Sequence, residues 1–95
     1  MPTVVVDWSQ IDSRETFFEL ILPQLGAPDW HGNNLDALSD SIIGDDINKL
    51  KAPYRVHFKN VDRISDDLLE FSGHVSDIFA QASEEHAVVV VHSVP

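Results

Sequence analysis

The sequence predicts a single α/β domain, a small three-stranded parallel sheet with about four helices packed against it. Two runs rich in β-branched residues, at 3–8 and 87–92, are typical of strands that are covered on both faces, as in a parallel sheet. The segments between the expected strands are long enough for right-handed crossovers that contain helices. The chain has 95 residues, of which 43% are apolar, and no repeat or linker divides it, so residues 1–95 should share one core.

A first helix is expected soon after the first strand. Asp12 or Ser13 can cap its amino end, because a short polar side chain there accepts a hydrogen bond from a free backbone N–H. Pro23 lacks an amide donor, so the helix should kink or end at residues 21–25, before Gly26. Its apolar stripe comprises Phe17, Leu20 and Ile21.

A second helix is expected between Asn33 or Asn34, either of which can cap it, and Gly44, which can close it. Three side chains recur at helical spacing and should face the core: Leu35, Leu38 and Ile42. The alternation of apolar and polar residues at 54–58 then predicts another strand, the second of the three in chain order.

Two further helices are expected before the last strand. Ser65 can cap the third helix, Gly73 is expected to interrupt the helical pattern, and the fourth helix should run over about 74–84. The last strand follows at 87–92. The apolar residues that these helices should bury are Leu68, Leu69, Phe71, Val75, Ile78 and Phe79.

The composition excludes several classes of partner. The chain carries 16 Asp and Glu residues against 6 Lys and Arg residues, a formal net charge of −10. Nucleic acids and anionic membranes are bound through basic residues, so we expect neither as a ligand. The chain has no cysteine, no signal-peptide pattern and no apolar stretch long enough to span a membrane, so we expect a cytoplasmic protein.

The charges are also separated along the chain. No basic residue lies between Arg14 and Lys49, although seven acidic residues do. Five of the six basic residues lie within 49–63, and we expect them to lie away from the binding face. A basic protein is therefore the expected partner.

Two acidic residues stand out in the span without basic residues. Asp36 and Asp40 lie four residues apart on the second expected helix and share one face, with Cβ atoms about 5–6 Å apart. Like charges at this spacing destabilise a helix slightly, and only Asp36 is near enough to the amino end to gain from the helix dipole. With Trp30 just before the helix, this face is typical of a surface that binds guanidinium and ammonium groups.

The segment around these acids resembles the core motif of the barstar family. The matching residues are Pro28, Asp29, Trp30, His31, Gly32, Asn33, Asn34, Leu35, Asp36, Ala37, Leu38, Asp40 and Gly44. The chain length and the order of strands and helices also match the family. The resemblance implies a barstar-like fold and a small cytoplasmic inhibitor, which binds a secreted, basic ribonuclease of the barnase type and blocks its active site.

The resemblance also implies which residues contact the partner. Asp36 and Asp40 match two carboxylates that engage basic residues in the ribonuclease active site. The other matching contact positions are Trp30, Gly32, Asn34, Leu35, Ile43 and Gly44. Ser39 and Asp45 stand where the family has tryptophans, and Gln81 stands where it has a glutamate. Because two aromatic anchors and one charge are replaced, a related toxin nuclease could be the target instead.

The sequence therefore predicts a bacterial ribonuclease inhibitor that is not an enzyme, needs no cofactor or metal, and is a monomer when free. Two alternatives remain open. The chain could be an immunity protein for a different toxin nuclease, or an acidic adaptor for a basic partner that is not a nuclease. A nuclease that copurifies with the chain would favour the inhibitor over the adaptor.

Metal binding and nucleophilic catalysis are weaker alternatives. Hard ligands for a metal ion could come from His31, Asp36, Asp40, Asp45 and Asp46. Their spacing is not that of an EF-hand loop, and the chain has no HExxH motif. It also has no cysteine, no GxSxG motif and no evident base for Ser39, so nucleophilic catalysis is not expected.

Overall fold

The computed structural model describes residues 1–95 and contains one sheet of three parallel strands. The strands are β1 (Thr3–Asp7), β2 (Tyr54–Lys59) and β3 (Val88–His92), with β2 in the centre. Across the sheet Val5 is the register partner of His57, and His57 is the partner of Val91. The predicted α/β fold with a three-stranded parallel sheet is confirmed.

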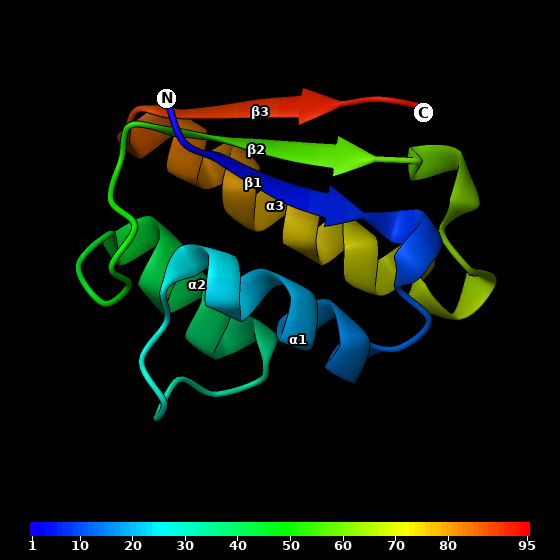
Figure 1. The fold of residues 1–95 in the computed structure, drawn as a ribbon, viewed down its shortest axis with the longest axis horizontal. Coiled ribbons are helices and arrows are strands. Elements are labelled where there is room, and N and C mark those ends of the chain that lie inside the picture. Colours follow the sequence, from blue (N-terminus) through cyan, green and yellow to red (C-terminus); the bar gives the residue numbers. More distant parts are fainter.

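Three helices and three short 3₁₀ turns complete the chain. The helices are α1 (Arg14–Leu25), α2 (Leu35–Gly44) and α3 (Leu69–Glu85), and the turns are η1 (Trp8–Gln10), η2 (Val61–Arg63) and η3 (Asp66–Leu68). All three helices lie on the same side of the sheet (Figure 1). No helix combines the length and the apolar character that a membrane crossing requires.

The other face of the sheet is open, so the expectation that the strands are covered on both faces is wrong. On β2 the side chains of Arg55, His57 and Lys59 point to this face, because they alternate with buried residues. The register places Val5 and Val89 on the same face, where they are 36% and 42% exposed. Valine suits a strand whether or not that strand is covered, so the valine runs alone did not reveal the open face.

The ends of α1 lie where local sequence signals place them. Ser13 is the N-cap and its Oγ accepts the Thr16 N–H at 3.1 Å, while the carboxylate of Asp12 accepts the Thr16 hydroxyl at 2.8 Å. Pro23 lies in the last turn, inside the helix. Gly26 then adopts a left-handed conformation with φ of 65°, which a side chain would disfavour, and the helix ends there.

The predicted break at Gly73 does not occur. α3 runs from Leu69 to Glu85 without interruption, and the helix expected after Ser65 is only the turn η3 that leads into it. A Cβ at Gly73 would meet no atom within 4 Å, so this residue lies on an open surface. Glycine costs a helix about 1 kcal/mol relative to alanine at such a site. Burial of the other face offsets this cost, through Phe71, Val75 and Phe79.

An aromatic cluster fills the space between the sheet and the helices. Trp8 stacks on Phe17 with 5.7 Å between the ring centroids, and Phe17 meets Phe71 edge-on at 5.1 Å. Phe58 of β2 also stacks with Trp8 and meets Phe79 of α3 edge-on. These contacts fix α1 and α3 under the sheet, while α2 packs mainly on α3.

Candidate partner-binding site

The amino end of α2 is shaped by Asn34 and Gly32. Asn34 is the N-cap, and its Oδ1 accepts the Ala37 N–H at 2.8 Å. A Cβ on Gly32 would lie 2.8 Å from Asn34 Nδ2 and 3.3 Å from the Cβ of Ala37. A side chain at position 32 would therefore push the preceding loop away from the cap. Both residues shape this surface, and their contact with a partner stays a prediction.

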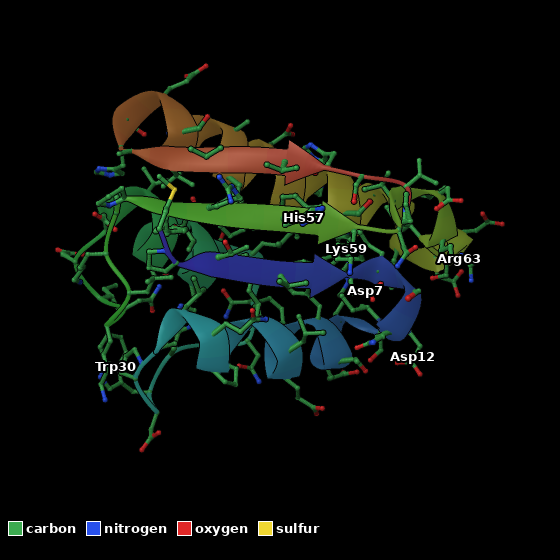
Figure 2. The ribbon with its side chains drawn as sticks, turned by 45° about the horizontal axis from the view of Figure 1, so that its top comes forward. Asp7, Asp12, Trp30, His57, Lys59 and Arg63 are labelled. Atoms are coloured by element: carbon green, nitrogen blue, oxygen red, sulfur yellow. The ribbon has the colours of Figure 1, made fainter.

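His31 fastens the loop before α2 to the middle of that helix. Its ring is buried, Nδ1 donates to the Gly32 carbonyl at 2.7 Å, and Nε2 lies 2.9 Å from the Ser41 hydroxyl. With His31 turned inward, the neighbouring Trp30 is left 74% exposed at the outer side of the loop (Figure 2). The motif contained His31, but only the structure shows that Ser41 is its partner.

Asp36 and Asp40 lie exposed on α2, one turn apart, as the spacing predicts. Leu38 and Ile42 of the same helix are buried, so the two acids occupy the outward side. Neither carboxylate has an ion pair or a side-chain hydrogen bond, and the single close contact between a basic and an acidic side chain in the molecule is that of His74 with Glu70, at 3.7 Å. Both carboxylates are thus available to a basic partner.

A groove between α2 and α3 brings further residues to the acidic side. It has a volume of about 330 Å³ and is lined by Leu35, Asp36, Ser39, His74, Asp77, Ile78 and Gln81. Asp77 is exposed and adds a third carboxylate that the motif did not indicate. The sequence did contain a signal for Asp77, because positions 74, 77, 78 and 81 share one face of a helix. Which helix this face meets is decided only by the packing of α2 on α3.

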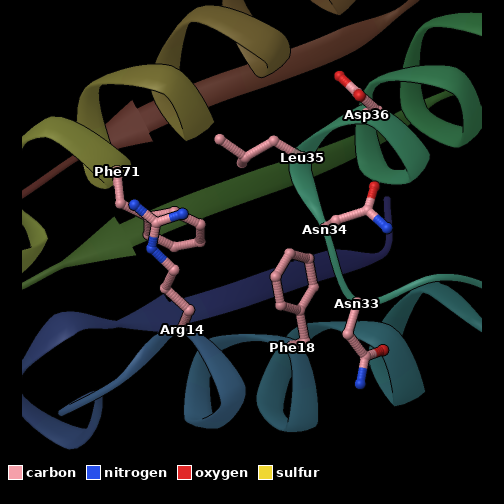
Figure 3. Close-up of a pocket in the computed structure, with 7 residues that line it drawn as sticks. All are labelled: Arg14, Phe18, Asn33, Asn34, Leu35, Asp36 and Phe71. Atoms are coloured by element: carbon pink, nitrogen blue, oxygen red, sulfur yellow. The ribbon is translucent and has the colours of Figure 1, made fainter.

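A second depression lies on the other side of the first turn of α2 (Figure 3). It has a volume of about 190 Å³ and is lined by Arg14, Phe18, Asn33, Asn34, Leu35, Asp36 and Phe71. The guanidinium of Arg14 lies over the Phe71 ring, 5.0 Å from its centroid, and forms no ion pair with Asp36. Leu35 and Asp36 line both depressions, so the first turn of α2 forms a ridge between them.

The carboxyl end of α2 differs from its prediction. Gly44 is the last helical residue, and the left-handed residue that closes the helix is Asp45, with φ of 56°. Aspartate tolerates this conformation better than most residues because its short side chain can bond to nearby backbone. Here that carboxylate lies 3.3 and 3.4 Å from the Ala52 N–H, which donates to it. Burial and the nearby charge of Asp45 together raise the pKa of Tyr54 to about 12.

Two more predicted contact residues have bonds within the chain. The carbonyl of Ile43 accepts a hydrogen bond from Nε2 of His86, which joins the end of α2 to the end of α3. Gln81 faces the groove on α3, and its Nε2 donates to the Glu85 carboxylate at 3.2 Å. Ile43 is half-buried and Gln81 is exposed despite these bonds. The contacts of both residues with a partner stay predictions.

The structure does not bring the candidate metal ligands together. His31 is in the interior, Asp45 points toward the Ala52 amide, and no group of three or more His, Asp or Glu side chains could hold an ion. Ser39 lies half-buried in the groove and has no hydrogen bond to a base. The arrangement is that of a surface with free carboxylates.

Three of the six basic residues lie on a different side of the molecule, whereas Arg14 lines the depression next to Asp36. The alternation of β2 places Arg55, His57 and Lys59 on the open face of the sheet. Figure 2 shows His57 and Lys59 on β2, and Arg63 beyond them in η2. None of these residues forms an ion pair. Lys49 and Lys51 lie closer to α2, in the segment between α2 and β2. The expected separation of basic residues from the acidic face therefore holds for β2 and η2.

Comparison of the chain with protein families gives a match over residues 1–92 to the family described as Barstar (barnase inhibitor). Comparison with curated proteins gives no match. The family match covers all three strands and all three helices, and so includes every predicted contact residue.

Proposed function

The chain belongs to the barstar family of barnase inhibitors, and we propose that it inhibits a barnase-type ribonuclease by covering the active site of that enzyme with α2. The observation that carries this proposal is the pair Asp36 and Asp40, which is exposed, unpaired within the chain and preceded in the sequence by the exposed Trp30. The chain would act by binding alone, without catalysing a reaction.

The chemistry of the target supports this role for the acids. A ribonuclease must hold phosphate, so its active site is lined with basic groups and surrounded by a positive field. Carboxylates on α2 can accept paired hydrogen bonds from guanidinium groups in place of phosphate oxygens. The net charge of −10 would speed the encounter, an effect for which the barnase–barstar pair is itself the usual example.

The groove between α2 and α3 supports a target that differs from barnase in detail. Ser39 is small, so it leaves the groove open where a tryptophan would fill it. Asp36 and Asp77 line the same groove and would favour a basic side chain of the partner there. A related toxin nuclease with a lysine or arginine at this point is thus the second candidate, with the chain as its immunity protein in the bacterial cytoplasm.

Inhibition at equimolar concentration tests the proposal. The chain is mixed with a purified barnase-type ribonuclease, and cleavage of a fluorogenic RNA is followed; we expect nearly complete loss of activity. A double variant, Asp36→Asn with Asp40→Asn, should release the enzyme. The matched control is Asp66→Asn with Asp67→Asn, which removes the same charge from exposed residues of η3 and should still inhibit.

Three outcomes would count against the proposal. Inhibition that both double variants retain would show that α2 is not the contact surface. No inhibition of any barnase-type enzyme, with capture of a different nuclease from a producing cell, would favour the immunity protein. Capture of a basic protein without nuclease activity would favour the adaptor.

A further inference from the structure

The two edge strands of the sheet differ in whether their outward backbone groups have hydrogen-bond partners. At the β1 edge, Gln24 of α1 reaches the backbone of Val5: its Oε1 accepts the Val5 N–H and its Nε2 donates to the Val5 carbonyl, both at 2.8 Å. One side chain thus satisfies the outward donor and acceptor in the middle of this strand. A further strand could pair there only by displacing Gln24.

The β3 edge has no such cover. The Tyr54 N–H donates to the Ala87 carbonyl, and the Ser93 N–H donates to the Phe58 carbonyl, so the odd-numbered residues of this strand pair with β2. By the alternation of a parallel ladder, the N–H and carbonyl of Val90 point away from β2, toward the free edge. None of the hydrogen bonds made by side chains of α3 reaches this backbone.

The helix beneath this edge also carries little charge on its outer flank. Positions 74, 77, 78 and 81 of α3 face the groove with α2. The opposite flank is formed mainly by small residues at spacings of three and four, namely Gly73, Ser76, Ala80 and Ser83, and it is bordered by Glu84, one turn after Ala80. The strand itself carries four valines and His92, without Asp, Glu, Lys or Arg. In a chain of net charge −10, this side can approach a second copy with few carboxylates near the contact.

We propose that two copies of the chain associate through this side, with their β3 strands antiparallel about a twofold axis at Val90. Each Val90 N–H would donate to the Val90 carbonyl of the other copy, and the His92 N–H to the Val88 carbonyl. Val89 of one copy, which is exposed on the open face, would lie opposite the half-buried Val91 of the other. The result is a continuous six-stranded sheet with the two α3 helices side by side.

The charge of the chain sets the behaviour of this dimer. The interface is small and the two copies repel each other through their net charges, so the dimer should form only at high concentration. At low concentration the chain should then be the monomer that the sequence predicts. Added salt should strengthen this dimer by screening the repulsion, whereas it should weaken binding to a basic nuclease.

Sedimentation equilibrium of the full chain from about 10 μM to 1 mM tests the proposal. The average mass should rise from 10.6 kDa toward twice that value, and at each concentration it should rise further in about 0.5 M NaCl. Ala80→Glu, an exposed change that places two carboxylates near the axis, should keep the mass at 10.6 kDa. Gln10→Glu adds the same charge on the exposed η1 turn and should leave the association unchanged.

Amide hydrogen exchange then locates the contact. Protection of the Val90 amide should increase with protein concentration, because that amide gains a partner only in the dimer. The proposal is overturned by a mass that stays at 10.6 kDa through 1 mM at both salt concentrations, or by a dimer that Ala80→Glu leaves intact. A dimer in which the Val90 amide stays unprotected would also overturn it.

Discussion

The α2 face with Asp36 and Asp40, and the side formed by the β3 edge and the α3 flank, are both exposed but differ in charge. The first combines unpaired carboxylates with Trp30, which is 74% exposed. The second combines Val89, 42% exposed, with a strand that has no acidic residue and a helix flank of mainly small residues. The difference teaches that in a chain of net charge −10 the placement of charge, more than the exposed apolar area, decides which partner a surface can accept.

The largest expected effect is on the acidic face. Asp40→Ala should weaken binding to a barnase-type ribonuclease most, because loss of one member of a desolvated charge pair costs about 2–5 kcal/mol. Asp36→Ala and Trp30→Ala should follow, and Gln81→Ala should have little effect. Isothermal titration calorimetry measures each affinity. If the Asp40→Ala variant bound as tightly as the parent, the α2 face would not be the contact surface.

The next effect concerns the support of that face. Ser41→Ala leaves Nε2 of His31 without its buried partner, which should lower the free energy of unfolding by about 1–3 kcal/mol. It should also weaken inhibition, because the loop that carries Trp30 loses its anchor on α2. Urea unfolding and the inhibition assay measure the two effects.

Ser72→Ala is the matched control for this prediction. Ser72 is a buried serine of α3 that donates to the Leu69 carbonyl at 2.8 Å and has no hydrogen bond to the loop before α2. Its replacement should lower stability without changing the affinity for the nuclease. Equal losses of affinity in Ser41→Ala and Ser72→Ala would mean that His31 has no specific role in the site.

A smaller effect is expected at the β1 edge. Gln24→Ala removes both side-chain hydrogen bonds to Val5, which should lower the free energy of unfolding by about 0.5–1.5 kcal/mol because water can replace them. It also opens a second free edge, so the variant should self-associate more strongly than the parent in sedimentation. Gln10→Ala, on exposed η1, should do neither. An unchanged mass and stability for Gln24→Ala would show that the edge needs no cover.

The smallest effect concerns an acid that is bound within the chain, unlike those of α2. Hydrogen bonds from the side chains of Ser9 and Asn60 lower the pKa of Asp7 below its usual value. A carboxyl with a lowered folded-state pKa stabilises the fold above its unfolded pKa, and this contribution is lost as the pH falls through the folded-state value. Asp7→Asn should therefore flatten the decline in stability below about pH 4. Its inhibition at neutral pH should equal that of the parent.

Thermal unfolding between about pH 2 and pH 6 measures this decline. The parent and Asp7→Asn curves should approach each other as the pH falls, because the parent alone loses the contribution of the ionised carboxylate. If the two curves stayed parallel over this range, the bonds to Asp7 would not stabilise its charged form in the folded state.

The fold could be predicted where local signals are strong. Ser13 and Gly26 mark the ends of α1, and Asn34 caps α2, because capping depends on side chains within a few residues of the helix end. The predicted break at Gly73 was wrong, whereas α2 does end at Gly44, although the left-handed residue that caps it is Asp45. Glycine favours a helix end but does not impose one, and in α3 the burial on its other face outweighs the local preference.

The candidate site, like the fold, could be predicted only where the signal lies within a few residues. The spacing of Asp36 and Asp40 predicted their common outward side, and the structure places both there without internal partners. The spacing could not show that Asp77 lines a groove with Asp36, or that Asp45 bonds to the Ala52 amide. These contacts join residues that are distant in the sequence, and the packing of separate elements decides them.

By itself the sequence determined the α/β class, the parallel sheet, the ends of α1 and the acidic side of α2, because periodicity, capping and charge spacing act over a few residues. Only the tertiary structure decided that one face of the sheet is open and that Gln24 covers one edge while the β3 edge stays free. The physical reason is that exposure of a strand depends on where helices pack and on which backbone groups they reach, and neither is encoded within the strand.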